Sequence, residues 1–348
     1  MDESKREFIA MSGALAAGAM MAGQAQAADA PGATARQKLE PTKDLRLATF
    51  SLPGDKSLRT GVVLDDGRVV DLGLEAKRKG MKLAFDAKSM LSLIAAGDAA
   101  LGQVRALAQG AKGEHPRIAE VFLDSPIPVA PRNIYCVGWN YLAHFEEGKA
   151  MRDPKQTYPE HPVFFSKASH AMNGPFSPIP FDPKVSTLID WEGELAVIIG
   201  KRGRNIPEAQ AMDHVFGFSV INDTTARDVQ SKRHGGQWFK GKSLDGHGPM
   251  GPWIVTRGAL DYGNLKLQTR VNGVVKQDAT TAQMFFKIPT IIAELSLGLT
   301  LEPGDIIATG TPPGVGNAMK PPEYMKPGDI METEIAGIGL IRNEIKAV

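Results

Sequence analysis

The chain has 348 residues, of which 43% are hydrophobic and 23% are charged, and its formal net charge is +1. This balance is typical of a folded protein with one large or two modest domains, and it leaves no global electrostatic basis for binding nucleic acid or a membrane surface. The only cysteine, Cys136, excludes an intrachain disulfide and a cysteine-based metal site. The 37 glycines and 24 prolines favour a strand-rich, loop-rich fold over a helical bundle.

Residues 1–27 have the pattern of a secretory signal peptide. Lys5 and Arg6 form a basic start, a short apolar run follows, and Ala25-Gln26-Ala27 matches a cleavage site. The stretch "SKREFI" also resembles the twin-arginine export motif, with Lys in place of the first Arg. We therefore expect an exported, periplasmic protein, or a cytoplasmic one if the signal is not used, with no membrane span in the mature form. The alternative is a disordered, alanine-rich extension. Residues 28–44 are polar and predict a tether.

Residues 45–126 predict a small α+β module. The stretches "LRLATFSL" and "TGVVLDDGRVVDL" alternate between apolar and polar residues, and Asp65-Asp66-Gly67 is a hairpin signal. The stretch "SMLSLIAAGDAALGQVRALAQGA" has apolar residues at helical spacing, with glycines at its breaks. No cluster of histidines, cysteines or acids occurs here, so we assign no chemistry to this module.

Residues 131–348 predict a strand-dominated domain. Short apolar runs alternate with Gly and Pro turns, and only "TAQMFFKIPTIIAELSLGL" is clearly helical in pattern, with an interruption near Pro289. This texture predicts a sandwich or barrel-like β core. The sequence contains no internal repeat and no glycine-rich phosphate-binding motif.

Three acids, Asp190, Glu192 and Glu194, open one apolar strand in "IDWEGELAVIIGKR". Residues two apart face the same side of a strand, so Glu192 and Glu194 point together. On a solvent face they would be ordinary exposed acids, but on an enclosed face a cation must separate them because buried like charges repel. Asp223 ends the next apolar strand, "HVFGFSVIND", and can reach the same place. Three carboxylates predict a hard divalent ion, either Mg²⁺ or Mn²⁺, with Ca²⁺ as a third option.

Polar and cationic residues follow these acids. Arg227 and Gln230 would share one helical face, and an arginine fork suits a carboxylate substrate; the alternative is a pair of solvated side chains. Lys240 and Lys242 lie in a glycine-rich loop that could hold a lysine beside an oxyanion, or could simply be solvated. Thr311 lies in the turn of "PGDIIATGTPPGVG", whose amides could hold a carboxylate, or which is only a turn.

The order of these motifs resembles the fumarylacetoacetate hydrolase family from about Asn133 to Ile345, in particular its bacterial acylpyruvate hydrolases and 2-oxo-acid hydratase-isomerases. Many bacterial members also carry a small N-terminal module. Each motif is weak alone, but seven occur in series: "VGWNYLAHFEEG", "PVFFSKAS", "DWEGELAVIIGK", "INDTTARDVQ", "QWFKGKSLDGHGPMGPW", "IPTIIAELS" and "GDIIATGTPPGVG". The resemblance implies a fold that is mainly β with some α: a mixed β-sandwich roll with a small N-terminal α+β module. It also implies a bound divalent metal and a homodimer.

The resemblance also implies roles for individual residues. The matching metal ligands are Glu192, Glu194 and Asp223, the matching active-site lysine is Lys242, and Asp190 is expected to support the ligands without binding the ion. The expected substrate-binding positions are Arg227, Gln230, Thr311, Lys167 and Trp139.

In "NYLAHFEEG", His144 and Glu147 match a catalytic dyad. They lie three residues apart, so one helical turn places them on one face, although by spacing alone they could be a surface pair. Glu147 would orient the imidazole while His144 takes a proton from water. Two positions depart from the family pattern: Trp139 replaces a common Arg, and His170 replaces a small or apolar residue. Both are expected on the substrate side, where Trp139 would favour a bulkier or less anionic substrate tail.

These observations predict a divalent-metal-dependent hydrolase that cleaves a C–C bond of a 1,3-dicarbonyl acid similar to acylpyruvate or fumarylacetoacetate. One alternative is an isomerase, hydratase or decarboxylase of a 2-oxo acid, similar to 2-hydroxyhepta-2,4-diene-1,7-dioate isomerase, that uses the same metal site. An alternative of another class is an exported, non-catalytic binder of oxo acids. The presence of Lys242, His144 and Glu147 argues against the binder, because binding alone does not require a base.

Overall fold

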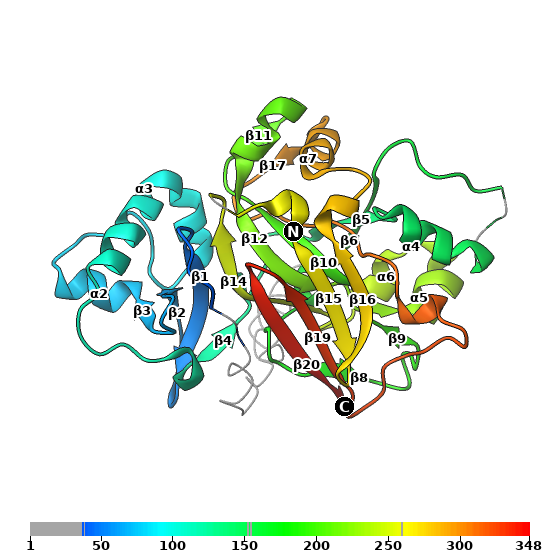
Figure 1. The fold of residues 1–348 in the computed structure, drawn as a ribbon, viewed down its shortest axis with the longest axis horizontal. Coiled ribbons are helices and arrows are strands. Elements are labelled where there is room, and N and C mark those ends of the chain that lie inside the picture. The colour runs from blue at the N-terminus through cyan, green and yellow to red at the C-terminus, as the bar shows by residue number, and fades with distance from the viewer. Residues whose placement is uncertain (1–36, 38, 152, 154, 259) are drawn as a thin grey trace, which may run out of the picture.

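The structure is a computed structural model that describes residues 37, 39–151, 153, 155–258 and 260–348, and its elements are labelled as in Figure 1. The expected signal segment, residues 1–27, lies outside the described residues, and so does most of the expected tether. The ribbon places the N-terminal elements on one side of the molecule. The short helices α4 (Leu142–Glu147), α5 (Arg227–Lys232) and α6 (Phe239–Lys242) lie on the opposite side (Figure 1).

The N-terminal part is an α+β unit, as the sequence predicts. Asp65-Asp66-Gly67 turns the chain between two antiparallel strands, and Gly67 has a φ of +83°. The long helix is capped by the Ser89 side chain and broken at Gly97, whose φ of 57° and ψ of −137° interrupt the helical path. The bounds of the elements in this part are β1 (Arg46–Leu52), β2 (Asp55–Val63), β3 (Val69–Asp71), α2 (Leu72–Arg78), α3 (Met90–Gln109), η3 (Ile118–Glu120) and β4 (Phe122–Asp124).

Helix α3 belongs to the core. Among the described residues it is the one helix long and apolar enough to span a membrane. However, it is broken at Gly97, and its apolar side chains Leu93, Val104 and Leu107 are fully buried against the protein. We therefore regard α3 as a helix that covers a sheet.

Within the described residues, the largest sheet has eleven strands, with the order β3-β2-β1-β14-β12-β10-β18-β5-β6, while β4 pairs with β1 and β7 with β14. The N-terminal strands are continuous with the rest because β1 pairs with β14 through Arg46–Val255 and Leu47–Ile254. The additional strands are β5 (Ile134–Gly138), β6 (Val163–Lys167), β7 (Met172–Asn173), β10 (Gly193–Ile199), β12 (Val215–Asn222), β14 (Gly248–Thr256) and β18 (Ile306–Ala308).

A second sheet, five-stranded in the described chain, has the order β16-β15-β19-β20-β8. Its strands are β8 (Ile179–Phe181), β15 (Lys266–Val271), β16 (Val274–Thr280), β19 (Ile330–Ile335) and β20 (Gly339–Ala347). Strands β15 and β19 contact β10, and β19 and β20 contact β12, so the two sheets face each other (Figure 1). The predicted architecture, mainly β with some α, is therefore confirmed.

The central strands β10 and β12 are buried on both faces. Leu195 and Val197 of β10 lie in the core shared with the second sheet, whereas Ala196 and Ile198 lie in the core shared with α3. A strand covered on both faces has continuously apolar residues instead of alternating ones, which explains the stretch "ELAVII". Carboxylates at the start of such a strand are therefore carried into the interior.

The remaining helices are short. They are α4 (Leu142–Glu147), α5 (Arg227–Lys232), α6 (Phe239–Lys242) and α7 (Ile288–Ser296), with the 3₁₀ turns η4 (Lys149–Met151), η5 (Ser169–Ala171), η6 (Glu208–His214), η7 (His234–Gly236), η8 (Tyr262–Asn264), η9 (Thr281–Gln283) and η10 (Gly316–Ala318). The short strand pairs are β9 (Ile189–Asp190) with β13 (Thr225–Ala226) and β11 (Gly203–Arg204) with β17 (Thr300–Leu301).

The expected helix around Pro289 differs in detail. Pro289 does not interrupt a helix but lies in the first turn of α7, after a separate 3₁₀ turn. Proline is favoured in this position because its missing N–H would have no intrahelical partner there and its φ is already helical.

Candidate functional site

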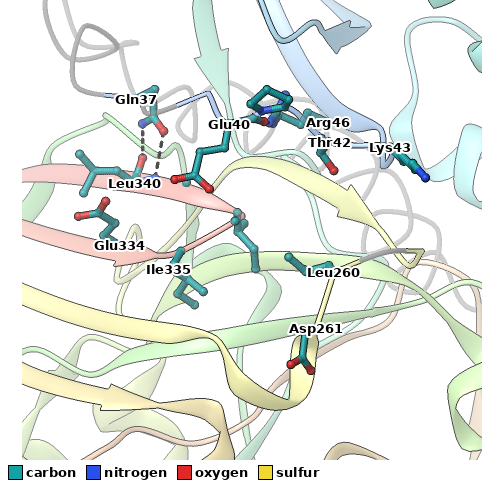
Figure 2. A pocket seen from close by; sticks show the side chains of 15 residues that line it. Gln37, Glu40, Thr42, Lys43, Arg46, Leu260, Asp261, Glu334, Ile335 and Leu340 are labelled. Carbon is teal, nitrogen blue, oxygen red and sulfur yellow. Dashed lines mark hydrogen bonds between the residues drawn. The ribbon is translucent and has the colours of Figure 1, made fainter.

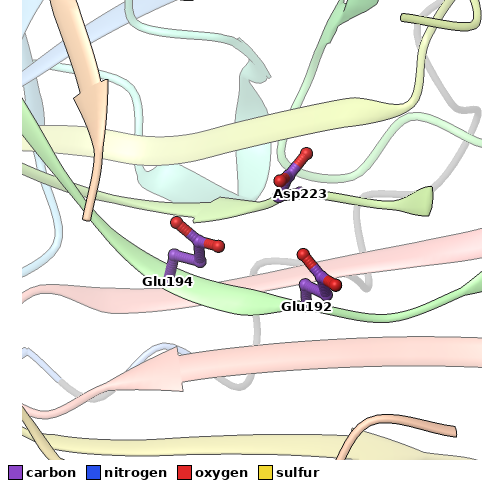
Figure 3. A group of neighbouring side chains, drawn as sticks. All are labelled: Glu192, Glu194 and Asp223. Atoms are coloured by element: carbon purple, nitrogen blue, oxygen red, sulfur yellow. The ribbon is translucent and has the colours of Figure 1, made fainter. Parts of the chain in front are cut away.

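Three carboxylates converge at the end of the central strands. Glu192, Glu194 and Asp223 are at most 4% exposed, and each offers an oxygen within 4.8 Å of the others. Figure 3 shows Glu192 and Glu194 on one strand, pointing towards Asp223 on its neighbour. The antiparallel pairing of Gly193 with Asn222 sets this arrangement, because it brings Asp223 opposite Glu192. The structure thus brings together the three acids that the sequence selects.

Cationic side chains surround this cluster. Lys242 Nζ lies 2.5 Å from Glu192 Oε2 and 2.7 Å from Asp223 Oδ2. Lys167 Nζ lies 2.7 Å from Asp223 Oδ1. Arg227 Nη2 lies 2.6 Å from Glu192 Oε1, and all three cations are buried. Both predicted lysines therefore contact metal-ligand candidates directly.

Asp190 is held apart from the other acids. It is fully buried and accepts hydrogen bonds from Arg227 Nε at 2.7 Å and from the amides of Gly316 and Asn317 at 2.7 and 2.9 Å. Its oxygens are thus engaged by an arginine and a backbone turn. Asp190 is not among the three acids whose oxygens converge, and its expected supporting role stays a prediction.

The charges of the cluster favour a further cation. In the described part of the network, four carboxylates, including Asp190, face the three cations Lys242, Lys167 and Arg227. Burial and the nearby Asp223 and Glu192 raise the pKa of Glu194 well above its usual value. Burial also acts to raise the pKa of Glu192, but Lys242, Arg227 and His144 outweigh it and lower that pKa to about 2. Buried hard oxygen donors with surplus negative charge fit Mg²⁺, Mn²⁺ or Ca²⁺.

The short helices place the lysine and the arginine. Arg227 is the first residue of α5, and its Nη1 donates to Gln230 Oε1 at 3.2 Å. Lys242 ends α6. A Cβ on Gly241 would lie 2.4 Å from the backbone nitrogen of Gln230, so only glycine lets α6 approach α5 this closely. In this structure the Arg227 guanidinium is engaged by Asp190, Glu192 and Gln230, and its expected contact with a substrate carboxylate stays a prediction.

Thr311 and Gln277 brace the strand between the two glutamates. Thr311 Oγ1 donates to the Gly193 carbonyl at 3.0 Å and accepts from Gln277 Nε2 at 2.7 Å. Gln277 is fully buried and accepts from Gly193 N at 2.9 Å. Sequence reasoning missed Gln277. The sequence signal that could have found it is the alternation in β16, which places Gln277 on the same buried side as Ala279.

The predicted histidine–glutamate pair is formed on α4. His144 Nδ1 lies 2.6 Å from Glu147 Oε1, and Gly314 N donates to Glu147 Oε2 at 2.7 Å. Helix α4 is anchored at its start by Asn140, which donates to the carbonyls of Phe286 and Thr309. His144 contributes to lowering the pKa of Glu192, so the imidazole lies within electrostatic range of the acidic cluster.

The two positions that depart from the family pattern lie in different surroundings. Trp139 has a φ of +54° and packs edge-on against Phe145 and Trp238, with ring centroids 5.7 and 4.9 Å apart. It therefore joins an aromatic cluster at the start of α4. His170 is exposed on η5, where its carbonyl accepts from Gly246. Substrate contacts of either residue stay a prediction.

A cavity of about 520 Å³ lies elsewhere, between residues 37–46 and the turn that joins β19 and β20. Figure 2 shows the Gln37 side chain forming two hydrogen bonds with the backbone of Leu340. The cavity is lined by side chains of both charges, and Arg46, one of them, forms an ion pair with Asp65. None of its lining residues belongs to the acidic cluster. We assign the chemistry to the acidic cluster and not to this cavity.

The fold and site are those of a mainly β protein with a buried cluster of acids that could hold a metal ion, and the comparisons with known proteins agree. The sequence model of the family "Fumarylacetoacetate (FAA) hydrolase C-terminal" matches residues 133–346. The chain is 41% identical over 293 residues to oxaloacetate tautomerase YisK of Bacillus subtilis, covering 82% of this chain and 95% of the relative. It is 39% identical over 315 residues to the bovine mitochondrial oxaloacetate tautomerase FAHD2B, covering 89% and 94%. The chain belongs to the fumarylacetoacetate hydrolase family.

Solved structures support the same assignment. A fumarylacetoacetate hydrolase from Exiguobacterium antarcticum is 38% identical, with a TM-score of 0.70 and coverage of 87% of this chain and 100% of that one. Maleylpyruvate hydrolase from Sphingobium sp. SYK-6, solved with manganese(II) and pyruvate, is 30% identical, with a TM-score of 0.68 and coverage of 87% and 99%. The family relatives are thus tautomerases and hydrolases that act on small organic acids.

The predicted export to the periplasm is wrong. The bovine relative, which this chain covers almost completely, is a mitochondrial enzyme. The basic start and alanine-rich run of residues 1–27 lie outside the described residues, and such a composition is not specific to export signals.

Proposed function

We propose that the protein is a divalent-metal-dependent tautomerase of small 2-oxo dicarboxylic acids, with oxaloacetate as the leading candidate. The observation that carries this proposal is the buried cluster of Glu192, Glu194 and Asp223, which contacts Lys242 and lies within electrostatic range of His144, the partner of Glu147. The proposal departs from the predicted C–C hydrolase towards the alternative isomerase chemistry. Both curated relatives described above are oxaloacetate tautomerases, which supports that change.

Glu192, Glu194 and Asp223 would hold the ion, and Mg²⁺ or Mn²⁺ suits their hard oxygen donors best. A bound divalent cation would polarise the 2-oxo group of the substrate and stabilise negative charge on its oxygen. Lys242 adds a fixed positive charge beside the same carboxylates. Burial lowers the pKa of Lys242, but Asp223 and Glu192 outweigh that effect and raise it, so the ammonium group stays protonated at neutral pH.

The His144–Glu147 pair would move the proton. Keto–enol interconversion takes a proton from C3 and places one on the 2-oxygen, or the reverse, so the composition of the substrate does not change. Glu147 accepts from Nδ1 of His144, which leaves Nε2 as the atom that takes or gives the proton at C3. No water has to attack a carbonyl in this reaction.

Hydrolysis of a C–C bond is the second candidate. The same His144–Glu147 pair could take a proton from water, and the maleylpyruvate hydrolase has the same fold. The two candidates differ in one requirement: hydrolysis must admit an attacking water, whereas tautomerisation need not. Decarboxylation and hydration of a 2-oxo acid are further alternatives that use the same metal site.

A substrate panel tests the proposal. Purified protein with Mg²⁺ or Mn²⁺ is given oxaloacetate, and the ultraviolet absorbance of its enol form is followed in time. We expect faster enol–keto interconversion without release of pyruvate or carbon dioxide. Acylpyruvates are assayed in parallel by chromatography of the cleaved acids. Unaccelerated oxaloacetate interconversion together with acylpyruvate cleavage would replace the tautomerase by the hydrolase.

A further inference from the structure

Gly314 links the start of β10 to α4 through both of its backbone polar groups. Its N–H donates to Glu147 Oε2 at 2.7 Å, and its carbonyl accepts from the indole Nε1 of Trp191 at 2.9 Å. Glu147 Oε1 in turn lies 2.6 Å from His144 Nδ1. A continuous series of three hydrogen bonds therefore runs from Trp191, the residue between Asp190 and Glu192, to the imidazole.

The loop that contains Gly314 is held tightly. Gly314 has a φ of +104°, and a Cβ there would lie 2.0 Å from the carbonyl oxygen of Lys276, so no other residue fits. Gln277 Nε2 donates to the Pro312 carbonyl at 2.8 Å on one side of Gly314. Asp190 accepts from the amide of Gly316 on the other side. At Gly314 itself, Trp191 binds the carbonyl and Glu147 binds the N–H.

Trp191 is equally constrained. Its side chain is fully buried, and a Cβ on Gly316 would lie 2.8 Å from its ring. By contrast, α4 has only six residues, and the side chains of His144 and Glu147 are 13% and 20% exposed. A helix this short has little stability of its own. In this series of hydrogen bonds, Trp191 is therefore the fixed end. The His144–Glu147 pair on α4 is the end whose position depends on its hydrogen bonds.

We infer that Trp191 is a positioning residue for the His144–Glu147 pair and acts through the backbone of Gly314. This inference rests on the proposed function for its kinetic consequences. The indole N–H holds the Gly314 carbonyl, which belongs to the peptide after the Gly314 Cα, whereas the N–H that Glu147 accepts belongs to the peptide before it. The two peptides are joined at the Gly314 Cα, whose φ of +104° is fixed by the crowded loop, so holding one of them helps to orient the other. Glu147 in turn orients the imidazole. The strand that carries the metal-ligand candidates and the helix that carries the base are thus held in one geometry.

The first test is Trp191→Phe, which removes the indole N–H and keeps an aromatic ring. The chain offers a matched control in Trp253→Phe, because Trp253 is also fully buried and its Nε1 donates to the Ile338 carbonyl at 2.6 Å, away from the site. We expect kcat to fall about ten- to a hundredfold in Trp191→Phe, with KM and Mn²⁺ affinity within about twofold of wild type. Trp253→Phe should lose comparable stability and keep its kcat. Parallel loss of Mn²⁺ affinity, or an equal fall of kcat in the control, would refute the inference.

A double-mutant cycle tests whether the effect passes through Glu147. If it does, Trp191→Phe should change kcat less than about twofold in a Glu147→Ala background, because the link is already broken. Additive effects of the two substitutions would mean that Trp191 acts by another route.

An activity-independent measurement separates this inference from the proposed function. In ¹H–¹⁵N spectra of the metal-loaded protein, Glu147→Ala should shift the indole N–H signal of Trp191 and speed its hydrogen exchange, while the Trp253 signal stays in place. This measurement does not require the Trp191 variant to fold, and it holds whatever substrate the enzyme uses. An unchanged Trp191 signal would overturn the inference, whereas a shifted signal in a protein inactive on oxaloacetate would overturn only the tautomerase.

Discussion

Within the acidic cluster, Glu194 is the carboxylate whose negative charge is least balanced by nearby cationic side chains. Glu192 contacts Lys242 and Arg227, and Asp223 contacts Lys242 and Lys167. The Glu194 carboxylate accepts a hydrogen bond from the backbone amide of Gly310, at 2.7 Å. Burying a carboxylate with so little positive charge nearby is unfavourable, so Glu194 should depend on a bound cation more than its neighbours do.

Replacing this residue should therefore remove the ion. We expect Glu194→Ala to weaken Mn²⁺ binding, measured by titration calorimetry, by more than about 100-fold, because changes to residues that merely support a ligand already cost 10–100-fold. Metal-dependent activity should disappear with it. Glu114→Ala, at an exposed position, is the control and should bind as wild type does. Unchanged Mn²⁺ affinity in Glu194→Ala would show that the acids do not form the metal site.

His144 should be separable from metal binding. We expect His144→Ala to slow the catalysed reaction by about 10²–10⁴-fold, the usual contribution of a general base, with Mn²⁺ affinity unchanged. The control is His161→Ala, because the His161 side chain is 76% exposed. If His144→Ala instead abolishes Mn²⁺ binding, then His144 supports the acidic cluster and is not the base.

At the scale of the elements, short strands and helices are tied to the sheets by buried polar side chains. His247, just before β14, is one example: its Nε2 donates to the carbonyl of Pro180 in β8 at 2.9 Å. Burial lowers the pKa of His247 from 6.5 to about 4, with a smaller contribution from Lys167 in the same direction. The folded protein therefore keeps this imidazole neutral where the unfolded chain would protonate it.

This difference predicts a dependence of stability on pH. Between pH 6.5 and about 4 the unfolded chain binds more protons than the folded one at His247, so stability falls as the pH falls through this window. The full contribution is roughly 3 kcal/mol. Urea unfolding of wild type and His247→Gln at pH 7 and pH 4 should show a smaller loss in the variant. Equal losses would mean that His247 does not carry this dependence.

In the whole molecule, the N-terminal part and the rest share a sheet and a core. β1 pairs with β14, and Ile198 and Ile254 of the central strands pack in the same core as Leu93 and Val104 of α3. The division into residues 45–126 and 131–348 stays a prediction, and so does the homodimer. Because the core is continuous, we expect residues 131–348 to fold poorly alone. Removing the N-terminal part would expose a large apolar face on the central strands.

A truncated chain tests this expectation. Residues 127–348, expressed without the N-terminal part, should aggregate or unfold without cooperativity, since the face covered by α3 would meet water. The measurements are solubility and urea unfolding beside the full chain. Cooperative unfolding of the fragment would establish two independent domains.

Metal binding should also stabilise the whole fold. A ligand that binds only the folded state stabilises it by about 2.7 kcal/mol at a concentration of 100 times Kd. Urea unfolding with Mn²⁺ and with a chelator should therefore differ by about this amount in wild type, and by nearly nothing in Glu194→Ala. A Mn²⁺ effect that persists in the variant would place the ion elsewhere.

Much of the fold and part of the site could be predicted from local patterns. Apolar runs and turn residues indicate short strands, and the period of two places Glu192 and Glu194 on one side. Asp223 follows because it ends the next strand, and antiparallel pairing brings strand ends together. His144 and Glu147 meet because residues three apart share a helical face. Each of these relations acts over a few residues or between neighbouring strands. The order of the residues is therefore enough to predict them. At the N-terminus, local patterns gave the wrong prediction. A basic start followed by an alanine-rich run occurs in several kinds of N-terminal extension and not only in export signals.

Only the tertiary structure decided the rest. Gln277 comes from the second sheet, 84 residues after the Gly193 amide that it binds, and nothing local in "VVKQDAT" identifies its partner. Trp191 and Gly314 are 123 residues apart, and they meet because the loop after β18 folds back over the start of β10. The amides that bind Asp190 are 126 and 127 residues away. Such contacts are set by how two sheets and their loops pack, and packing depends on the shapes of distant side chains and not on any periodicity along the chain.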